Sequence, residues 1–202
     1  MLPFGMARWM LRACAIVVVT LVAASAAASV SVAVTWDGLL RQSTAAVVAT
    51  PVEARAVWEG NRIYTYTRVR IDRAVAGGLA AGSDVWVRTM GGAVDNVGQS
   101  VDGEPVLLPG QQSLVFLHPA PVSGFDVTAR GQGQFPVVSD DKQLPPHLVR
   151  SSSAGLLVRP RGSASSAPLA ADVVHGRRVD DVAGDIVAAW DRTHADRSTP
   201  AP

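Results

Sequence analysis

The sequence predicts a mainly β fold, a small OB-like antiparallel barrel or a sandwich, with a C-terminal α-helix packed on it. Short segments of alternating apolar and polar residues recur between residues 45 and 140, separated by glycine-containing turns. Roughly five or six such strands in about 95 residues favour a small barrel, which also removes exposed sheet edges. A helical spacing of apolar residues then returns near the C-terminus, at residues 179–194.

The N-terminus carries the pattern of a secretory signal peptide. Arg8 and Arg12 precede the apolar run Ala13–Ala24, and small residues follow at positions 25–29. The run is shorter than the about 20 residues that a membrane-spanning helix needs. We therefore expect residues 1–28 to be removed after Ala26 or Ala28 rather than kept as an anchor. The product is then secreted or periplasmic, with no stable membrane span after cleavage.

The charge and cysteine content of the chain argue against several classes of partner and of stabilising site. The 202 residues hold 18 Lys and Arg against 17 Asp and Glu, a formal net charge of +1. Nucleic acid is excluded as the main partner because phosphate binding requires a clear basic excess. The single cysteine, Cys14, lies in the predicted signal peptide. The mature chain is therefore expected to have neither a disulfide nor a cysteine-based zinc site.

A short helical lead-in, residues 29–44, is predicted before a β domain that spans residues 45–140. Trp36, Leu39 and Leu40 recur at helical spacing, and Thr35 or Asp37 provides an N-cap. These three apolar side chains are expected to face inward.

Two long strands open the predicted β domain as a hairpin, Ala45–Glu59 and Ile63–Val75, joined by the turn at residues 59–62. Pro51 cannot donate a ladder hydrogen bond, so it predicts an edge or a bulge. One face of the first strand is expected to be apolar, and its members are Val48, Val52, Ala54, Ala56 and Trp58.

Later strands follow the same pattern. They are expected at Asp84–Met90, Ser113–His118, Phe125–Ala129 and Gln134–Val138. The apolar run at residues 114–117 predicts a strand buried on both faces. The connection Gly91–Gly110 is long enough to be functional or mobile, or else it folds as an ordered loop that tucks Val94, Val97 and Val101 onto the core.

The last third of the chain has a different composition. Residues 141–171 are predicted to be loop and linker, and residues 172–194 a helical segment followed by a disordered tail at 195–202. The helix Val179–His194 is expected to dock on the barrel with Trp190 largely buried. Its predicted apolar stripe consists of Val179, Val182, Ile186, Val187 and Trp190.

Catalytic chemistry finds little support in the sequence. The four histidines, His118, His147, His175 and His194, share no metal-ligand spacing, so neither a metal nor another cofactor is expected. Ser100 lies outside a G-x-S-x-G motif, and is expected to be a turn residue. The paired carboxylates 140–141 and 180–181 are best explained as a solvated turn and as charges in the first turn of a helix. We therefore expect no catalytic residue.

A non-enzymatic binding or interaction domain is the function that remains, and a secreted hydrolase with an unrecognised active site is the alternative. Tyr64, Tyr66, Arg68 and Arg70 alternate along one strand and are the candidate ligand-binding residues. Two aromatic rings beside two guanidinium groups suit a polysaccharide, and another exported protein is the second expected partner. The competing interpretation is a solvated face whose arginines pair with acids such as Glu53.

The order of these strands resembles that in a group of uncharacterised exported bacterial β-domain proteins, and in the OB-fold barrels of the netrin-like and metalloproteinase-inhibitor class. The resemblance rests on residues 47–49, 64–69, 85–89, 91–92, 114–117 and 131–137. It implies a barrel at roughly residues 45–140. The inhibitors depend on an N-terminal cysteine and disulfides, which the predicted mature chain lacks. The resemblance therefore carries over neither inhibition nor any functional residue.

Overall fold

The computed structural model describes residues 30–139, 145–162 and 166–195. The predicted signal peptide, Asp140 and Asp141, and nearly all of the predicted tail lie outside the described residues. Within the described part, no helix is both long enough and apolar enough to span a membrane.

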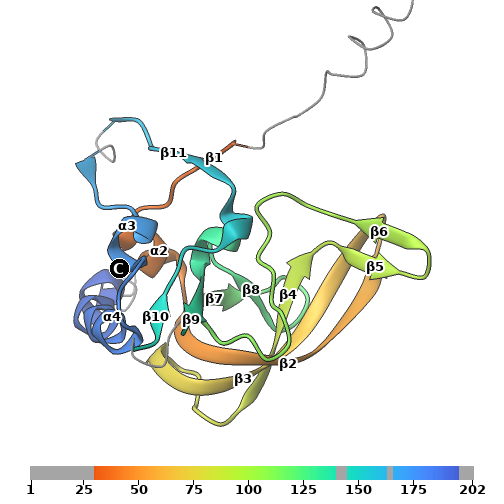
Figure 1. Ribbon diagram of the computed structural model, residues 1–202, viewed down its shortest axis with the longest axis horizontal. Coiled ribbons are helices and arrows are strands. Elements are labelled where there is room, and N and C mark those ends of the chain that lie inside the picture. Colours follow the sequence, from red (N-terminus) through yellow and green to blue (C-terminus); the bar gives the residue numbers. More distant parts are fainter. Residues whose placement is uncertain (1–29, 140–144, 163–165, 196–202) are drawn as a thin grey trace, which may run out of the picture.

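Five strands form a ring, and this ring is the centre of the fold (Figure 1). They are β2 (Ala45–Glu59), β3 (Arg62–Gly77), β4 (Asp84–Met90), β7 (Ser113–Pro119) and β8 (Phe125–Val127). The pairing runs β7-β2-β3-β4-β8 and returns from β8 to β7. All of these pairs are antiparallel except β4–β8, a short parallel pairing. The predicted mainly β, barrel-like fold is confirmed, although the ring is closed unevenly.

Smaller elements surround the ring. The strands among them are β1 (Val30–Val32), β5 (Gly92–Val94), β6 (Val97–Gln99), β9 (Gln134–Val138), β10 (His147–Leu148) and β11 (Leu156–Val158). The helices are α2 (Trp36–Gln42), α3 (Ala170–Val174) and α4 (Val179–His194), with single 3₁₀ turns η1 (Arg130–Gly133) and η2 (Ser152–Ala154). Residues 141–171, predicted as loop and linker, thus contribute β10, η2 and β11, and β11 pairs in parallel with β1.

Two apolar cores lie on either side of the sheet. Strand β7 serves both, because Val115 and Leu117 point into the ring whereas Leu114 and Phe116 point toward the helices. This arrangement confirms the prediction of a strand buried on both faces. The inner core consists of Ala45, Val47, Ala49, Val69, Ile71, Val87, Val115, Leu117 and Val127.

The outer core lies between the sheet and the helices α2, α3 and α4. Helix α2 begins as predicted, with the Thr35 side chain accepting a hydrogen bond from the backbone of Gly38. Trp36 packs edge-on against Phe116, with ring centroids 6.1 Å apart. The C-terminal helix therefore docks on the β domain through a core that the lead-in helix shares.

The apolar stripe of α4 differs from the expected one. Val182, Ala183, Ile186 and Ala189 are buried, whereas Val187 is 56% exposed. One residue corresponds to about 100° around a helix, so a stripe centred on Ile186 carries Val187 toward solvent. Trp190 is half-buried rather than largely buried, and its ring stacks on His194 at 4.2 Å.

The apolar face predicted for the first strand also differs. Val52 is 37% exposed and Trp58 is 47% exposed. The ladder is irregular between Pro51 and Glu53, which is the bulge that the proline predicted. Beyond this point β2 has left β7 and pairs with β3 alone, while β3 continues to pair with β4 on its other side as far as Tyr64 (Figure 1).

Candidate functional site

The four predicted binding residues share the outer face of β3, as period-two alternation requires. Their exposure is unequal, because Tyr66 is only 9% exposed and Tyr64 and Arg68 are half-buried. Arg70 alone is plainly exposed. The expectation that all four side chains are open to a ligand is therefore wrong for Tyr66.

Neighbouring acids engage the two arginines. Arg68 binds Glu53 at 3.0 Å and also binds Asp84, which in turn accepts from Arg70 at 3.3 Å. The hydrogen bonds from Arg68 hold the pKa of Glu53 and of Asp84 below their usual ranges. The pairing of Arg68 with Glu53 follows the competing interpretation of this face. These ion pairs remove the free positive charge that an anionic polymer needs.

A row of polar side chains continues around the barrel from this face. Each strand contributes one residue to this row, and each residue lies opposite the next in the strand register. In order around the barrel they are Arg55 (β2), Tyr66 (β3), Arg88 (β4), Asp126 (β8) and His118 (β7). Side chains paired in this way are close enough to touch. The row therefore links the predicted residues to groups that the sequence did not single out.

Arg88 is the centre of this row, and its side chain is only 10% exposed. It donates to both oxygens of Asp126, each at 3.0 Å, and to Glu59 at 3.2 Å. Its guanidinium lies 4.6 Å from the ring centroid of Tyr64. The hydrogen bonds that Arg88 donates to Asp126 raise the pKa of Arg88, so its charge is permanent. Burial, and the hydrogen bond that its hydroxyl donates to Glu59, raise the pKa of Tyr66.

Three adjoining hollows surround the segment 99–107, and we call them together the Glu104 groove because Glu104 lines each one. The first hollow, about 240 Å³, opens into the end of the barrel, where inward-facing Thr65, Thr67 and Thr89 line it. The second, also about 240 Å³, is bordered by Tyr64, Arg88, Met90, Glu104, His118, Asp126 and Arg130. Tyr64 is thus the predicted residue that reaches the groove.

The two carboxylates of the second hollow are fully engaged. Asp126 is held by Arg88 through both oxygens. Glu104 accepts from Arg130 through one oxygen and from the backbone N–H of Met90, at 3.0 Å, through the other. Because all four oxygens accept hydrogen bonds from fixed donors, neither carboxylate is free to move a proton.

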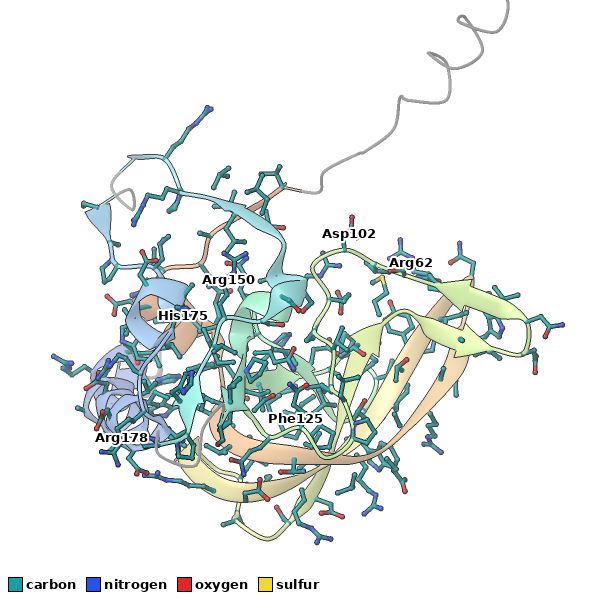
Figure 2. All side chains as sticks on the ribbon, in the orientation of Figure 1. Arg62, Asp102, Phe125, Arg150, His175 and Arg178 are labelled. Carbon is teal, nitrogen blue, oxygen red and sulfur yellow. The ribbon has the colours of Figure 1, made fainter. Side chains whose placement is uncertain are left out.

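A third, larger hollow of about 440 Å³ lies between the segment 100–106, β1 and η2. Its polar groups include Ser31, Ser100 and Ser152, whose hydroxyls make no hydrogen bond to another group of the described chain. Asp102 stands at the rim, and Figure 2 shows its side chain pointing outward from the loop. The apolar walls are Val101, Val106 and Leu156.

Three glutamine side chains hold the walls of the groove. Gln134 is 1% exposed, and its amide accepts from the N–H of Val106 at 3.1 Å and donates to the same residue's carbonyl at 2.7 Å. Gln132 binds the backbone of Val32 and Val34 in the same manner. Gln99 accepts from the N–H of Ile63 at 2.9 Å. Each amide thus replaces a neighbouring strand, a role that no local sequence pattern predicts.

The backbone near η1 is unusually constrained. Ala129 and Arg130 adopt consecutive left-handed conformations, with φ of 55° and 57°. A Cβ on the adjacent Gly133 would lie 2.0 Å from the carbonyl oxygen of Thr128, so glycine is required there. This turn positions the Arg130 guanidinium on Glu104. The strain therefore lies in the wall of the groove.

The connection at residues 91–110, left open by the sequence, is ordered through these contacts. It contains the β5–β6 hairpin, and Pro105 and Gly91 are buried. Val97 is 49% exposed, so it does not tuck onto the core as that alternative supposed.

The histidines and Ser100, which the sequence analysis considered for catalysis or metal binding, do not come together in the described part of the chain. Among the described residues, no group of three or more His, Cys, Asp or Glu could hold a metal ion. His118 lies 3.3 Å from the hydroxyl of Thr128, which is itself buried and bonded to Ser43. Ser100 lies in the third hollow, and its hydroxyl contacts no histidine within the described chain.

Comparison with known proteins adds no family to this description. No family model, no curated protein and no solved structure matches the chain.

Proposed function

We propose that this chain is an exported, non-enzymatic binding domain that takes a carbohydrate chain in the Glu104 groove. The proposal rests on one contrast inside the groove. In the second hollow Arg88 pairs with Asp126 and Arg130 pairs with Glu104, whereas the third hollow offers serine hydroxyls and the Asp102 carboxylate at its rim. A neutral, hydroxyl-rich ligand fits such a lining better than an ion does.

The chemistry of sugars matches the third hollow in two ways. Serine hydroxyls both donate and accept, and the Asp102 carboxylate accepts, which suits the alternating donors and acceptors of a polyol. Val101, Val106 and Leu156 supply the apolar surface against which the C–H face of a sugar ring packs. The second hollow shares Glu104 with the third and reaches Tyr64, so it offers a place for further sugars of a chain.

A secreted hydrolase remains the competing function, because Glu104 and Asp126 line one hollow. Glycoside hydrolysis needs one carboxyl that carries a proton and another that is free to attack or to activate water. Arg88 and Arg130 occupy those oxygens, which favours binding without turnover.

A polysaccharide panel tests the proposal. The exported protein is expected to retain neutral polysaccharides and to release no reducing ends from them. A variant carrying Asp102→Ala and Ser152→Ala should bind at least tenfold more weakly, with Asp95→Ala on the exposed β5–β6 turn as the matched control. Absence of binding across the panel, or release of reducing ends, would contradict the proposal.

A further inference from the structure

The outer half of β2 has an open edge. Residues 45–49 of this strand pair with both β3 and β7, whereas within the described chain residues 53–58 pair with β3 alone. Val52, Glu53, Ala54 and Arg55 are all exposed, although Glu53 is bonded to Arg68 and the Arg55 guanidinium lies 4.9 Å from the ring centroid of Trp86. An exposed strand edge is a template for pairing with another strand.

The backbone groups that face this open edge follow from the hydrogen bonds of Ile63. Its N–H donates to Gln99 and its carbonyl accepts from Gly91, so both groups point away from β2. Its partner Trp58 therefore directs its own N–H and carbonyl away from β3. Every second residue of a strand directs its N–H and carbonyl to the same side. Ala56 and Ala54 therefore also present their N–H and carbonyl groups at the open edge.

Pro51 and the bulge beside it protect the start of this edge, but no such device follows along residues 53–58. Val52 and Trp58 are 37% and 47% exposed and share one face with Ala54. Glu53 and Arg55 lie on the opposite face, two residues apart and opposite in charge. The edge has no lysine and no proline between residues 52 and 58, although these are common devices against pairing.

We propose that two copies of this chain pair antiparallel along this edge, with Ala54 on the two-fold axis. In that register Glu53 lies opposite Arg55 of the partner subunit, and the symmetry repeats the pair. An axis through Glu53 or through Arg55 would instead place like charges opposite each other. The charge pattern therefore favours the register centred on Ala54, in which Glu53 keeps Arg68 and gains Arg55 of the partner subunit as a second cation.

The geometry of the ladder fits the same register. Ala54 presents its backbone to the edge, so it forms a hydrogen-bonded pair with Ala54 of the partner subunit, and its methyl group allows close approach. Glu53 then belongs to a non-hydrogen-bonded pair, in which the opposing side chains lie closest. Trp58 lies diagonal to Val52 of the partner subunit, so both exposed apolar side chains become covered.

Sedimentation of the exported protein tests the dimer, and two variants test its register. The protein is expected to sediment at twice the monomer mass at micromolar concentration. Ala54→Pro removes an edge-facing N–H that β3 does not use, so it should weaken the dimer at least tenfold while circular dichroism stays unchanged.

The second variant, Ala54→Cys, tests whether the two copies of residue 54 lie close together at the two-fold axis. Opposed hydrogen-bonded residues have Cα atoms about 5.5 Å apart, within disulfide range. Ala54→Cys should form a covalent dimer under mild oxidation, whereas Asn96→Cys on the exposed β5–β6 turn should not. A protein that stays monomeric at about 100 μM, roughly a hundredfold above a micromolar Kd, would overturn the proposal, as would a dimer that survives Ala54→Pro and does not cross-link.

Discussion

Arg88 and Asp126 form two parallel hydrogen bonds, each 3.0 Å long, at the point where β4 meets β8. The ladder there pairs only two residues on each strand, Val87 with Phe125 and Arg88 with Asp126. The side-chain fork therefore supports the weakest backbone joint of the ring. It also sets the wall of the second hollow, so closure of the barrel and shape of the groove depend on one ion pair.

Replacement of Arg88 is expected to destabilise the fold. Arg88→Met should lower the free energy of unfolding by about 3 kcal/mol, because it leaves Asp126 and Glu59 without their partner in a poorly solvated site. Arg88→Lys should recover only part of the loss, since an ammonium group cannot form the two-pronged contact. Urea denaturation measures both variants. A loss below about 1 kcal/mol for Arg88→Met would show that the pair does not hold the joint.

Stability should fall on acidification through the ion pairs of β3. Hydrogen bonds from Arg68 lower the folded-state pKa of Glu53 from 4.5 and of Asp84 from 3.8. A carboxyl with a depressed folded pKa contributes stability above its unfolded pKa and loses it as the pH falls through the folded pKa. The contribution is therefore complete above about pH 5 and declines below about pH 4.

The matched variant for this prediction is Arg68→Gln. Denaturation midpoints measured from pH 6 down to pH 2.5 should fall less steeply in Arg68→Gln than in the unchanged protein. Arg73→Gln is the control, because its partner is Asp180 on α4, far from these two acids in the sequence. Equal pH slopes for the Arg68 variant and the unchanged protein would contradict the assignment.

Loss of the Gln134 amide should loosen the groove. Gln134→Leu leaves the N–H and carbonyl of Val106 without partners, at a cost of about 2 kcal/mol. Hydrogen exchange of residues 100–107 should accelerate more than that of β7. Gln111→Leu, on an exposed neighbouring turn, should change neither quantity. Unchanged protection of Val106 would show that water replaces the amide at no cost.

The two faces of α4 are expected to respond differently to truncation. Ile186→Ala, at a fully buried position, should cost about 3 kcal/mol, and Val187→Ala less than about 0.5 kcal/mol. Trp190→Ala should fall between them, because Trp190 is half-buried and stacks on His194 of the same helix. Thermal denaturation ranks the three variants. A larger loss for Val187 than for Ile186 would place the helix on the sheet by another face.

Local sequence patterns predicted correctly those elements that the rest of the fold packs against along their whole length. The run of Leu114 to Leu117 identified a doubly buried strand, and Thr35 identified the start of α2. The expected inward face of β2 was wrong at Val52 and Trp58, because alternation cannot tell where a strand leaves its neighbour. The β2–β3 ladder is irregular at Pro51, where the sequence predicted an edge or a bulge. The sequence did not predict that β2 leaves β7 at this point.

The groove was largely beyond sequence reasoning. Arg88 and Asp126 are separated by 38 residues, and Gln134 and Val106 by 28, so no local spacing connects them. Of the predicted binding residues, Tyr64 lines the groove. Arg68 forms ion pairs with Glu53 and Asp84, and Arg70 forms one with Asp84. Charged side chains on a strand reveal a binding surface only when the acids of the neighbouring strands are known.

The central claim is that the Glu104 groove binds a carbohydrate chain and does not cleave it. One calorimetric titration of the protein with a retained polysaccharide, followed by a reducing-end assay on the same sample, tests both parts. Saturable heat that Asp102→Ala reduces, with no new reducing ends, is the predicted result. Reducing ends that accumulate with time and disappear in Glu104→Gln would contradict the claim and establish a hydrolase.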